Sequence, residues 1–364
     1  MSAHRKLLII RDLDGLRAVR KSWLQLEEKA RYKSVFNSYA WIETWVEHYS
    51  KYIKSLLLFT YWDSDELCSV LPLYISVKSP STAHYVSSFE PEHIETCSEM
   101  QDFLSLTEGS LMPTELFHEL IVSEKIDTIK LSNVSPGSLF LKWASNLSGY
   151  QQQTKQRTRF YIELPNGIEK LERKTLRYRK VASKIGVKVR KVCETHELET
   201  VFNALVNLNS NHWLSKGKAA IFQENEFACF HKNVASKLLL NSSLSLYYLE
   251  YQGSIIAVNY SFVSGTSIIF YQSGNNTHFR PNISPGLLLH YAQASEAICQ
   301  GSQIYDFMSS SISSGYKTQF ANTHEDVVAF ELCLNFSSLL KNNFVNTLRK
   351  LRSWGASGAK LSQS

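Results

Sequence analysis

One segment in the second half of the chain, Ser284-Pro-Gly286, has the composition of a helix N-terminus that binds an anion. Pro285 suits the first helical turn, because its missing N–H would have no intrahelical acceptor there. Ser284 suits the N-cap position, and Gly286 lets a ligand approach the exposed N–H groups. Such an N-terminus favours phosphate or pyrophosphate. A well-capped surface helix would use the same residues, so this segment alone leaves both interpretations open.

A second candidate for anion binding is the basic window 169–191, which holds ten Lys and Arg against two Glu. Some of its cations recur at steps of three or four and therefore share one face of a predicted helix, namely Arg173, Arg177, Lys180 and Lys184. A solvated helix face is the alternative, but the charge exceeds what solubility needs. The face predicts an anionic partner: cofactor phosphates, an anionic glycan, a lipid head group or a nucleic acid.

The net charge of the chain changes abruptly where this window begins. The 364 residues carry a net charge of +6, yet residues 1–150 contain 15 Lys and Arg against 19 Asp and Glu. A step in charge of this kind indicates a domain boundary, and the length fits two domains. We therefore predict an N-terminal domain at 1–164, a C-terminal domain at 165–340, and a basic helical and flexible tail at 341–364.

Composition and spacing exclude several classes of protein. The eleven histidines and six cysteines form no cluster at metal-ligand spacing, so no metal site is predicted. The chain contains no P-loop, no dinucleotide-binding glycine motif and no serine-hydrolase elbow. The scattered cysteines, the short apolar run at the N-terminus and the lack of a long apolar stretch predict a cytoplasmic protein with no transmembrane segment.

The hydrophobic pattern predicts strands grouped beside helices in both halves of the chain, which indicates two α+β domains with mixed sheets. Predicted helices cover about 16–31, 38–49, 168–185, 198–214, 226–240 and 284–299, and two further helices flank a strand within 113–150. Predicted strands cover 7–11, 56–62, 67–77, 128–131, 158–164, 187–192, 244–251, 255–263, 267–273, 304–308 and 326–335. The segment after 308, including Tyr316 and Lys317, is predicted as a loop.

The order of three strands, an S-P-G-x-L-L helix and a D-F…G…Y-K ending resembles the GNAT-type acyltransferases of the CelD-like group, which are related to the FemAB peptidyltransferases. The residues are Tyr305-Asp306-Phe307 and Gly315-Tyr316-Lys317. Further similar segments are Phe36-Asn-Ser-Tyr-Ala-Trp41 with Trp45, Leu71-Pro-Leu73, Arg173–Gly186 and His212-Trp213-x-x-x-Gly217. Together they cover residues 20–335.

The resemblance implies two GNAT-like domains, each a mixed, mostly antiparallel sheet flanked by helices. It further implies that the C-terminal domain binds acetyl-CoA or another acyl-CoA as co-substrate, with no permanently bound cofactor. By this resemblance, the pyrophosphate lies at Ser284, Gly286 and Leu287. The family carries a tighter R/Q-x-x-G-x-G/A loop, of which Arg280 and Gly286 are a distant version.

Acyl transfer from a thioester needs a base for the acceptor and a proton for the leaving thiolate. Asp306 is a candidate base, or it orders the nearby loop. Tyr316 could protonate the thiolate, and Lys317 could bind a phosphate or an acidic acceptor. His212 is a second candidate base, although a helical histidine often has a structural role. Tyr271 and Ser273 are expected to line the acyl cleft.

The leading hypothesis is an acyltransferase that moves an acyl group, acetyl by preference, from an acyl-CoA-type thioester to an amine or hydroxyl of a polysaccharide or cell-envelope precursor. One alternative is a FemAB-like peptidyltransferase that uses aminoacyl-tRNA, for which the basic helix would contact RNA; without tRNA, no nucleic acid is expected. The other is a non-catalytic GNAT-fold module that binds an anionic polymer.

Overall fold

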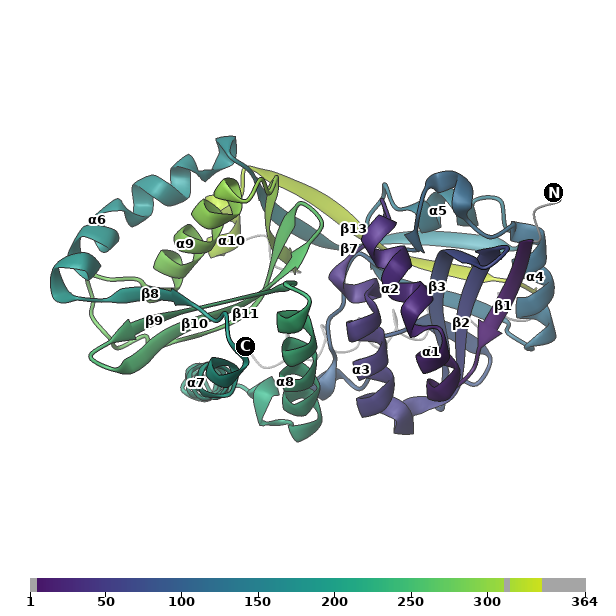
Figure 1. The fold of residues 1–364 in the computed structure, drawn as a ribbon, viewed down its shortest axis with the longest axis horizontal. Coiled ribbons are helices and arrows are strands. Elements are labelled where there is room, and N and C mark those ends of the chain that lie inside the picture. Colours follow the sequence, from purple (N-terminus) through teal and green to yellow (C-terminus); the bar gives the residue numbers. More distant parts are fainter. Residues whose placement is uncertain (1–4, 311–314, 336–364) are drawn as a thin grey trace, which may run out of the picture.

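The computed structural model describes residues 5–310 and 315–335, with only the backbone of Tyr316. One sheet runs through both halves of the molecule in the order β1-β2-β3-β4-β6-β13-β7-β12-β11-β10-β9-β8, with β5 beside β3 (Figure 1). The strands are β1 Arg5–Ile10, β2 Ile53–Asp63, β3 Glu66–Ser76, β4 Thr82–Tyr85, β5 Leu104–Ser105, β6 Thr128–Val134, β7 Tyr150–Glu163, β8 Lys188–Lys191, β9 Leu244–Tyr251, β10 Ser254–Ser264, β11 Ser267–Asn275, β12 Ile304–Ser310 and β13 Thr323–Cys333.

The helices flank this sheet. They are α1 Leu13–Ala18, α2 Arg20–Lys29, α3 Tyr39–Tyr49, α4 Thr114–Ser123, α5 Leu139–Ala144, α6 Glu169–Ile185, α7 Thr195–Leu214, α8 Asn225–Leu240, α9 Pro285–Cys299 and α10 Tyr316–Phe320. Sheet neighbours are antiparallel except for the pairs β4–β6 and β11–β12. The predicted α+β class, with mixed and mostly antiparallel strands beside helices, is confirmed.

The two halves of the sheet repeat one plan and exchange their last strands. The predicted boundary at residue 165 directly follows β7, yet β7 pairs with β12 of the second half. Conversely, β13 returns to pair with β6 of the first half. β7 and β13 also pair with each other, from Tyr161↔Thr323 to Tyr150↔Cys333. These two strands cross the middle of the molecule in Figure 1 and join both halves into one sheet.

Several local predictions agree with the structure, and two need correction. The helix predicted over 38–49 is α3, whose N-cap Ser38 accepts a hydrogen bond from Trp41 N. The helix predicted over 168–185 is α6, which ends at Gly186 with a φ of 82°, a conformation common at helix C-termini. The single helix predicted over 16–31 is divided into α1 and α2, because Val19 leaves helical geometry. The segment predicted as a Tyr-Lys loop begins the short helix α10.

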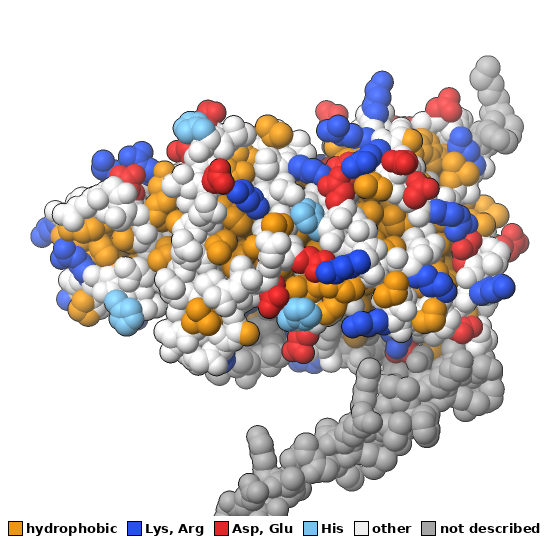
Figure 2. Space-filling model, turned by 90° about the horizontal axis from the view of Figure 1, so that it is seen from below, with side chains coloured by type: hydrophobic (Ala, Val, Ile, Leu, Met, Phe, Trp, Pro, Cys, Tyr) orange, Lys and Arg blue, Asp and Glu red, His pale blue; other side chains and the backbone are white. Residues whose placement is uncertain are grey.

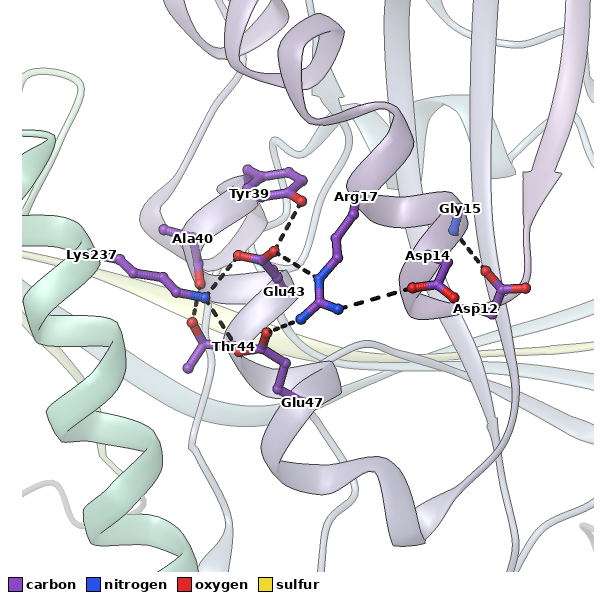
Figure 3. A network of polar contacts seen from close by, with 10 residues as sticks. All are labelled: Asp12, Asp14, Gly15, Arg17, Tyr39, Ala40, Glu43, Thr44, Glu47 and Lys237. Atoms are coloured by element: carbon purple, nitrogen blue, oxygen red, sulfur yellow. Dashed lines mark hydrogen bonds and ion pairs between the residues drawn. The ribbon is translucent and has the colours of Figure 1, made fainter.

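Helices from the two halves pack directly against each other. Trp41 of α3 lies edge-on to Phe230 of α8, with ring centroids 5.1 Å apart. Nearby, Lys237 Nζ of α8 donates to Glu43 Oε2 (2.8 Å) and Glu47 Oε2 (3.4 Å) of α3 (Figure 3). Arg17 of α1 lies on the other side of the same two carboxylates. Apolar and ionic contacts therefore fix how the halves sit together.

The surface differs between the two ends of the molecule. Figure 2 shows basic side chains gathered at its left end, which Figure 1 shows to be formed by α6 and β8. Basic and acidic side chains are mixed at the other end. Within the described ranges, no helix is both long and apolar enough to cross a bilayer, and no group of side chains is suited to hold a metal ion. The predicted tail, 341–364, lies outside the described residues.

Candidate active site

The parallel strands β11 and β12 pair only where they begin, from Ser267↔Ile304 to Ile269↔Asp306. β11 continues to Asn275 and β12 to Ser310, so the strands separate beyond these pairs. A cavity of about 860 Å³ lies in the space they leave. Its walls are formed by the two strands, the N-terminus of α9, parts of α6, α7 and α10, and a segment of the first half, around 97–99.

The N-terminus of α9 opens onto this cavity, as the sequence predicts. Ser284, Gly286 and Leu287 all line it. Ser284 occupies the N-cap position, but its side chain makes no capping hydrogen bond. No described residue accepts a hydrogen bond from the N–H of Gly286 or Leu287, so these donors are available to an anion. Asn275 Oδ1, which a Cβ on Gly286 would approach to 3.1 Å, is buried and has no hydrogen-bond partner among the described residues.

Two further residues, Lys317 and Arg280, were predicted to contact phosphate, and only Lys317 is among the residues that line the cavity. Lys317 lines the cavity. Arg280 lies outside its lining, with Nη2 donating to Tyr251 Oη at 3.2 Å. The side chain of Tyr316 lies outside the described residues, although its backbone begins α10 directly before Lys317. Tyr271 and Ser273, predicted to line the acyl cleft, both face the cavity.

The carboxylate of Glu99, which the sequence did not single out, reaches into the cavity from the first half of the chain. It is 3% exposed and accepts hydrogen bonds from Ser309 N at 2.8 and 3.0 Å and from Ser309 Oγ. Burial raises the pKa of Glu99, and the charge of Asp306 raises it further, whereas the Ser309 bonds and Lys317 lower it. A carboxylate with a raised pKa inside a cleft is a candidate general base.

Lys317 lies on the other side of the same bulged segment of β12. Its Nζ donates to Ser309 O at 3.2 Å and Met308 O at 3.4 Å. Burial lowers the pKa of Lys317, while Glu99 and Asp306 act in the opposite direction. Met308 has a φ of 60°, so the strand departs from regular pairing here. Glu99 and Lys317 together hold this irregular backbone at the wall of the cavity.

Asp306, the predicted base, lies beneath that wall with its carboxylate fully occupied. It is completely buried, and its Oδ2 lies 2.7 Å from both Nε and Nη2 of Arg159 on β7. Its Oδ1 accepts from Met308 N at 2.8 Å. Asp306 is not among the residues that line the cavity. This placement favours the loop-ordering role over the role of base.

His212, the second predicted base, lies on α7 at the cavity wall beside Trp213. Burial lowers its pKa, and the charge of Lys216 lowers it further. α7 is held against β11 by close backbone packing: a Cβ on Gly274 would lie 2.7 Å from Leu205 O. Asn209 Nδ2, also on α7, donates to Ser273 O at 2.7 Å. His212 is therefore held at the cavity wall with a lowered pKa, which favours the neutral imidazole.

The four cations predicted to share a helix face do so on α6. Arg173, Arg177, Lys180 and Lys184 are all exposed, and none forms an ion pair within the described part of the chain. They lie on the outer surface and do not line the cavity. Lys174 of the same helix does line it. The basic face therefore continues from the outer surface toward the cavity through Lys174.

Two residues of the site, Glu99 and Arg159, were missed because their partners are distant in the sequence. Glu99 lies in an irregular acidic stretch without periodicity, 210 positions before Ser309. Arg159 lies in a strand that was predicted from its apolar pattern, 147 positions before Asp306. One signal in the sequence was available for Arg159, because it is a basic residue within a predicted strand whose C-terminal part is apolar. A buried cation needs a carboxylate partner, so this position indicated an ion pair.

Comparison with known proteins agrees with this geometry. Residues 170–318 match the family model Acetyltransf_6, described as an acetyltransferase (GNAT) domain. The match extends from α6 into α10 and includes most of the cavity lining that comes from the second half, but not Gln319 and Phe320. No curated protein matches the sequence significantly. Residues 170–318 are therefore similar to GNAT acetyltransferase domains, and this similarity supports an acyltransferase.

Solved structures show a similar fold over nearly the whole chain. The structure of FemX has 12% sequence identity and a TM-score of 0.62, covering 91% of this chain and 98% of that one. L-PGS from Bacillus licheniformis has 11% identity and a TM-score of 0.55, covering 93% and 96%. A Bacteroides thetaiotaomicron protein of unknown function has 12% identity and a TM-score of 0.56, covering 90% and 100%. At these identities the likeness concerns the fold, which includes both halves.

Proposed function

We propose that this chain is an acyltransferase of the CelD-like group, which transfers an acyl group, acetyl by preference, from acyl-CoA to an amine or hydroxyl acceptor such as a polysaccharide or cell-envelope precursor. The observation that carries this proposal is one cavity that joins two chemical features. The cavity is lined by the start of α9, whose first N–H groups have no acceptor among the described residues, and by the buried carboxylate of Glu99. The first suits a pyrophosphate and the second suits proton transfer.

The donor fits the side of the cavity that belongs to β11 and α9. Its phosphates would accept hydrogen bonds from the N–H groups of Gly286 and Leu287, with Lys174 adding positive charge at the rim. The acyl thioester would lie between the separated strands, beside Tyr271 and Met308, which line the cavity. The acceptor would enter from the side formed by the first half, where Glu99 lies.

In the proposed reaction the acceptor's nitrogen or oxygen attacks the thioester carbonyl carbon, and its proton passes to the carboxylate of Glu99. The new C–N or C–O bond forms as the C–S bond breaks, and the CoA thiolate leaves. The thiolate then takes up a proton, for which the Tyr316 hydroxyl remains the proposed donor. Lys317, held at the same wall, stabilises the negative charge of the intermediate. His212 is kept as the alternative base.

Asp306 acts in this scheme as a positioning residue. Its ion pair with Arg159 and its bond to Met308 N hold the bulge of β12, and that bulge places Ser309 against Glu99. Removing the Asp306 carboxylate would leave Arg159 with an uncompensated buried charge on this side. We expect loss of stability together with activity when Asp306 is replaced, whereas a base would affect activity alone.

The donor site is tested by thermal unfolding with acetyl-CoA. We expect acetyl-CoA at 100 times its Kd to stabilise the protein by about 2.7 kcal/mol, and Gly286→Val to remove the effect by obstructing the N-terminus of α9. Gly137→Val is the matched control, because Gly137 precedes the N-cap of α5 and a Cβ there would meet nothing within 4 Å. Stabilisation that survives Gly286→Val would show that the donor binds elsewhere.

A second candidate, transfer from aminoacyl-tRNA as in FemAB-like enzymes, is favoured by the exposed basic face of α6. That face would contact the RNA backbone, and Lys174 would lead the acceptor end of the RNA to the cavity. This alternative predicts RNA binding whose affinity falls steeply as the salt concentration increases. The RNA affinity should also be lower in an Arg173→Gln, Arg177→Gln double variant than in the wild type. The leading proposal predicts acetyl-CoA binding that the same double variant leaves unchanged.

A further inference from the structure

Two arginines on β7, Arg157 and Arg159, lie on the same face of the sheet but in very different electrostatic surroundings. The residues from Arg157 to Arg159 pair in continuous register with Val327 to Glu325 of β13. Without a bulge between them, positions two apart in a strand point to the same face. The side chain of Arg157 therefore lies next to the buried network around Arg159 and Asp306.

Arg159 is fully compensated by carboxylates. Its guanidinium makes two contacts of 2.7 Å with Asp306 Oδ2, and its Nη1 lies 3.4 Å from Glu325 Oε2. Arg157 forms no hydrogen bond or ion pair with any described residue through its side chain, although it is half-buried and lines the cavity. Glu95 lies within range of its charge but beyond ion-pair distance. A half-buried guanidinium without a partner is suited to bind an anion from outside the chain.

The whole cavity has an excess of positive charge. Its lining contains one carboxylate, that of Glu99, and four cations, namely Arg157, Lys174, Lys216 and Lys317. Lys317 donates to carbonyls of β12 and lies close to two carboxylates. Lys216 lies over the ring of Trp213, 5.6 Å from its centroid. Arg157 and Lys174 have no ion-pair partner within the described ranges. A single ligand anion bound to one of them would leave the positive charge of the other without a counter-ion.

The position of Arg157 in the sheet separates it from the donor end of the cavity. The strand order is β7-β12-β11, and α9, at whose N-terminus the donor phosphates would bind, follows β11. β12 therefore lies between Arg157 and that end. Arg157 is close to Cys97 and Lys317, whose pKa values it affects, and all three residues line the part of the cavity around Glu99.

We infer that Arg157 binds an anionic group of the acceptor, a carboxylate or a phosphate, and holds it beside the amine or hydroxyl that Glu99 deprotonates. This inference rests on the proposed acyl transfer. A planar guanidinium can donate two parallel hydrogen bonds to either anion, which fixes the orientation of the acceptor as well as its affinity. The acceptor is thereby specified as an anionic amine or alcohol.

The test compares acceptors that differ only in this anionic group. With acetyl-CoA as donor, release of CoA thiol is measured with β-alanine against β-alaninamide and with phosphoethanolamine against ethanolamine. The first pair tests a carboxylate and the second a phosphate. Each compound is assayed with the wild type, Arg157→Gln and Arg157→Lys. Lys155→Gln is the matched control, since Lys155 lies on the same strand and pairs with Asp326 outside the cavity.

We expect Arg157→Gln to lower kcat/KM for at least one anionic acceptor by about 10- to 100-fold, the range of a charge-assisted hydrogen bond. The neutral partner should change less than about twofold, Arg157→Lys should recover part of the loss, and Lys155→Gln should have no effect. An equal loss for the anionic and neutral members of both pairs would overturn the inference, as would a wild type that prefers the neutral members.

A binding measurement keeps the inference distinct from the proposed reaction. With CoA present in excess, phosphoethanolamine and β-alanine are titrated against the wild type and Arg157→Gln while thermal unfolding is followed. At least one anion should raise Tm in the wild type and not in the variant, even if no turnover is seen. If neither anion discriminates between the two proteins, Arg157 is not an anion site. If acetyl-CoA neither binds nor releases thiol, the proposed function fails separately.

Discussion

The two halves of this molecule open their sheets in the same way, but among the described residues the opening is filled in the first half and forms a cavity in the second. In the second half, β11 and β12 pair over three residues and then separate around the cavity. In the first half, β4 and β6 are also parallel and pair over three residues, from Thr82↔Thr128 to His84↔Lys130. There the chain itself occupies the space between the strands, with Gln101 fully buried and bonded through both amide atoms to Ser132 of β6.

The difference shows how two copies of one fold can take different roles, one structural and one that forms the proposed site. The segment that fills the first opening runs from β4 to β5, and Met100 N donates to Asn133 O of β6. The residue directly before Met100 is Glu99, which turns the other way and reaches Ser309 of the second half. The polypeptide that closes one cleft therefore supplies the proposed base to the other. The proposed catalytic site therefore needs both halves.

The largest effect is expected for Glu99→Gln. If Glu99 is the base, its amide should lower kcat for acyl transfer by about 10²- to 10⁴-fold, with little change in acetyl-CoA affinity. Because the pKa of Glu99 is raised, the wild-type rate should fall as pH decreases through a value above the ordinary range of a glutamate, when the base becomes protonated. Thiol release measured against pH checks both expectations.

Glu92→Gln is the matched control for that variant, because Glu92 is an exposed residue of the same segment. It should retain the wild-type rate and pH profile. A Glu99→Gln protein with near-normal kcat and an unchanged acid limb would show that the first half only supports the fold, and would make His212 the better candidate.

A smaller effect, on stability alone, is expected for Gln101→Ala in the filled cleft. The change leaves the buried Ser132 N–H without its acceptor, which was held at 2.8 Å, and should lower the free energy of unfolding by about 1–3 kcal/mol. Stabilisation by acetyl-CoA should be unaffected, since the proposed donor site lies in the other half. Gln152→Ala, at an exposed position of β7, should change the unfolding free energy by less than about 0.5 kcal/mol. Loss of donor binding in Gln101→Ala would contradict the division of work.

The smallest effect is expected at the contact between the halves, for Lys237→Met. Burial acts against the charged form of Glu43, but the hydrogen bond and charge of Lys237 lower its pKa overall. The contribution of this pair is therefore present above the ordinary pKa of a glutamate and is lost as pH falls through the lower folded value.

Lys237→Met should lower the free energy of unfolding by about 0.5–1 kcal/mol at neutral pH. It should also make this free energy depend less on pH below neutrality. Chemical unfolding at pH 7 and pH 3 measures this difference. The control is Lys232→Met, whose pair with Glu199 lies within the second half and is largely exposed. A larger loss at pH 3 than at pH 7 would contradict the assignment.

Much of the candidate site could be predicted because it depends on local signals. The start of α9 is indicated by three consecutive residues, Ser284, Pro285 and Gly286, and the end of α6 is indicated by Gly186. These features depend on capping and backbone preference, which act between near neighbours. The helices and most strands follow from hydrophobic period for the same reason.

The rest depends on contacts between distant segments, which one sequence does not reveal. The exchange of β7 and β13 is decided by pairing across more than 150 positions, and residues 151–156 of β7 are mostly exposed and polar, so they carry no strand period. Glu99 was indistinguishable from its acidic neighbours, because only its contact with Ser309 shows that it is buried. Asp306 lies beneath the cavity wall, but its ion pair with Arg159, a residue 147 positions away in the sequence, makes the role of base unfavourable.

The most direct test of the account is the stoichiometry of CoA binding by isothermal titration calorimetry. We expect one CoA per chain, because among the described residues the opening between β11 and β12 lies beside a helix N-terminus whose first N–H groups have no acceptor, and we expect no binding to Gly286→Val. Gln101→Ala should still bind one CoA. Two CoA molecules per chain, or one that remains bound to Gly286→Val, would contradict the central claim that the cleft between β11 and β12 is the single donor site.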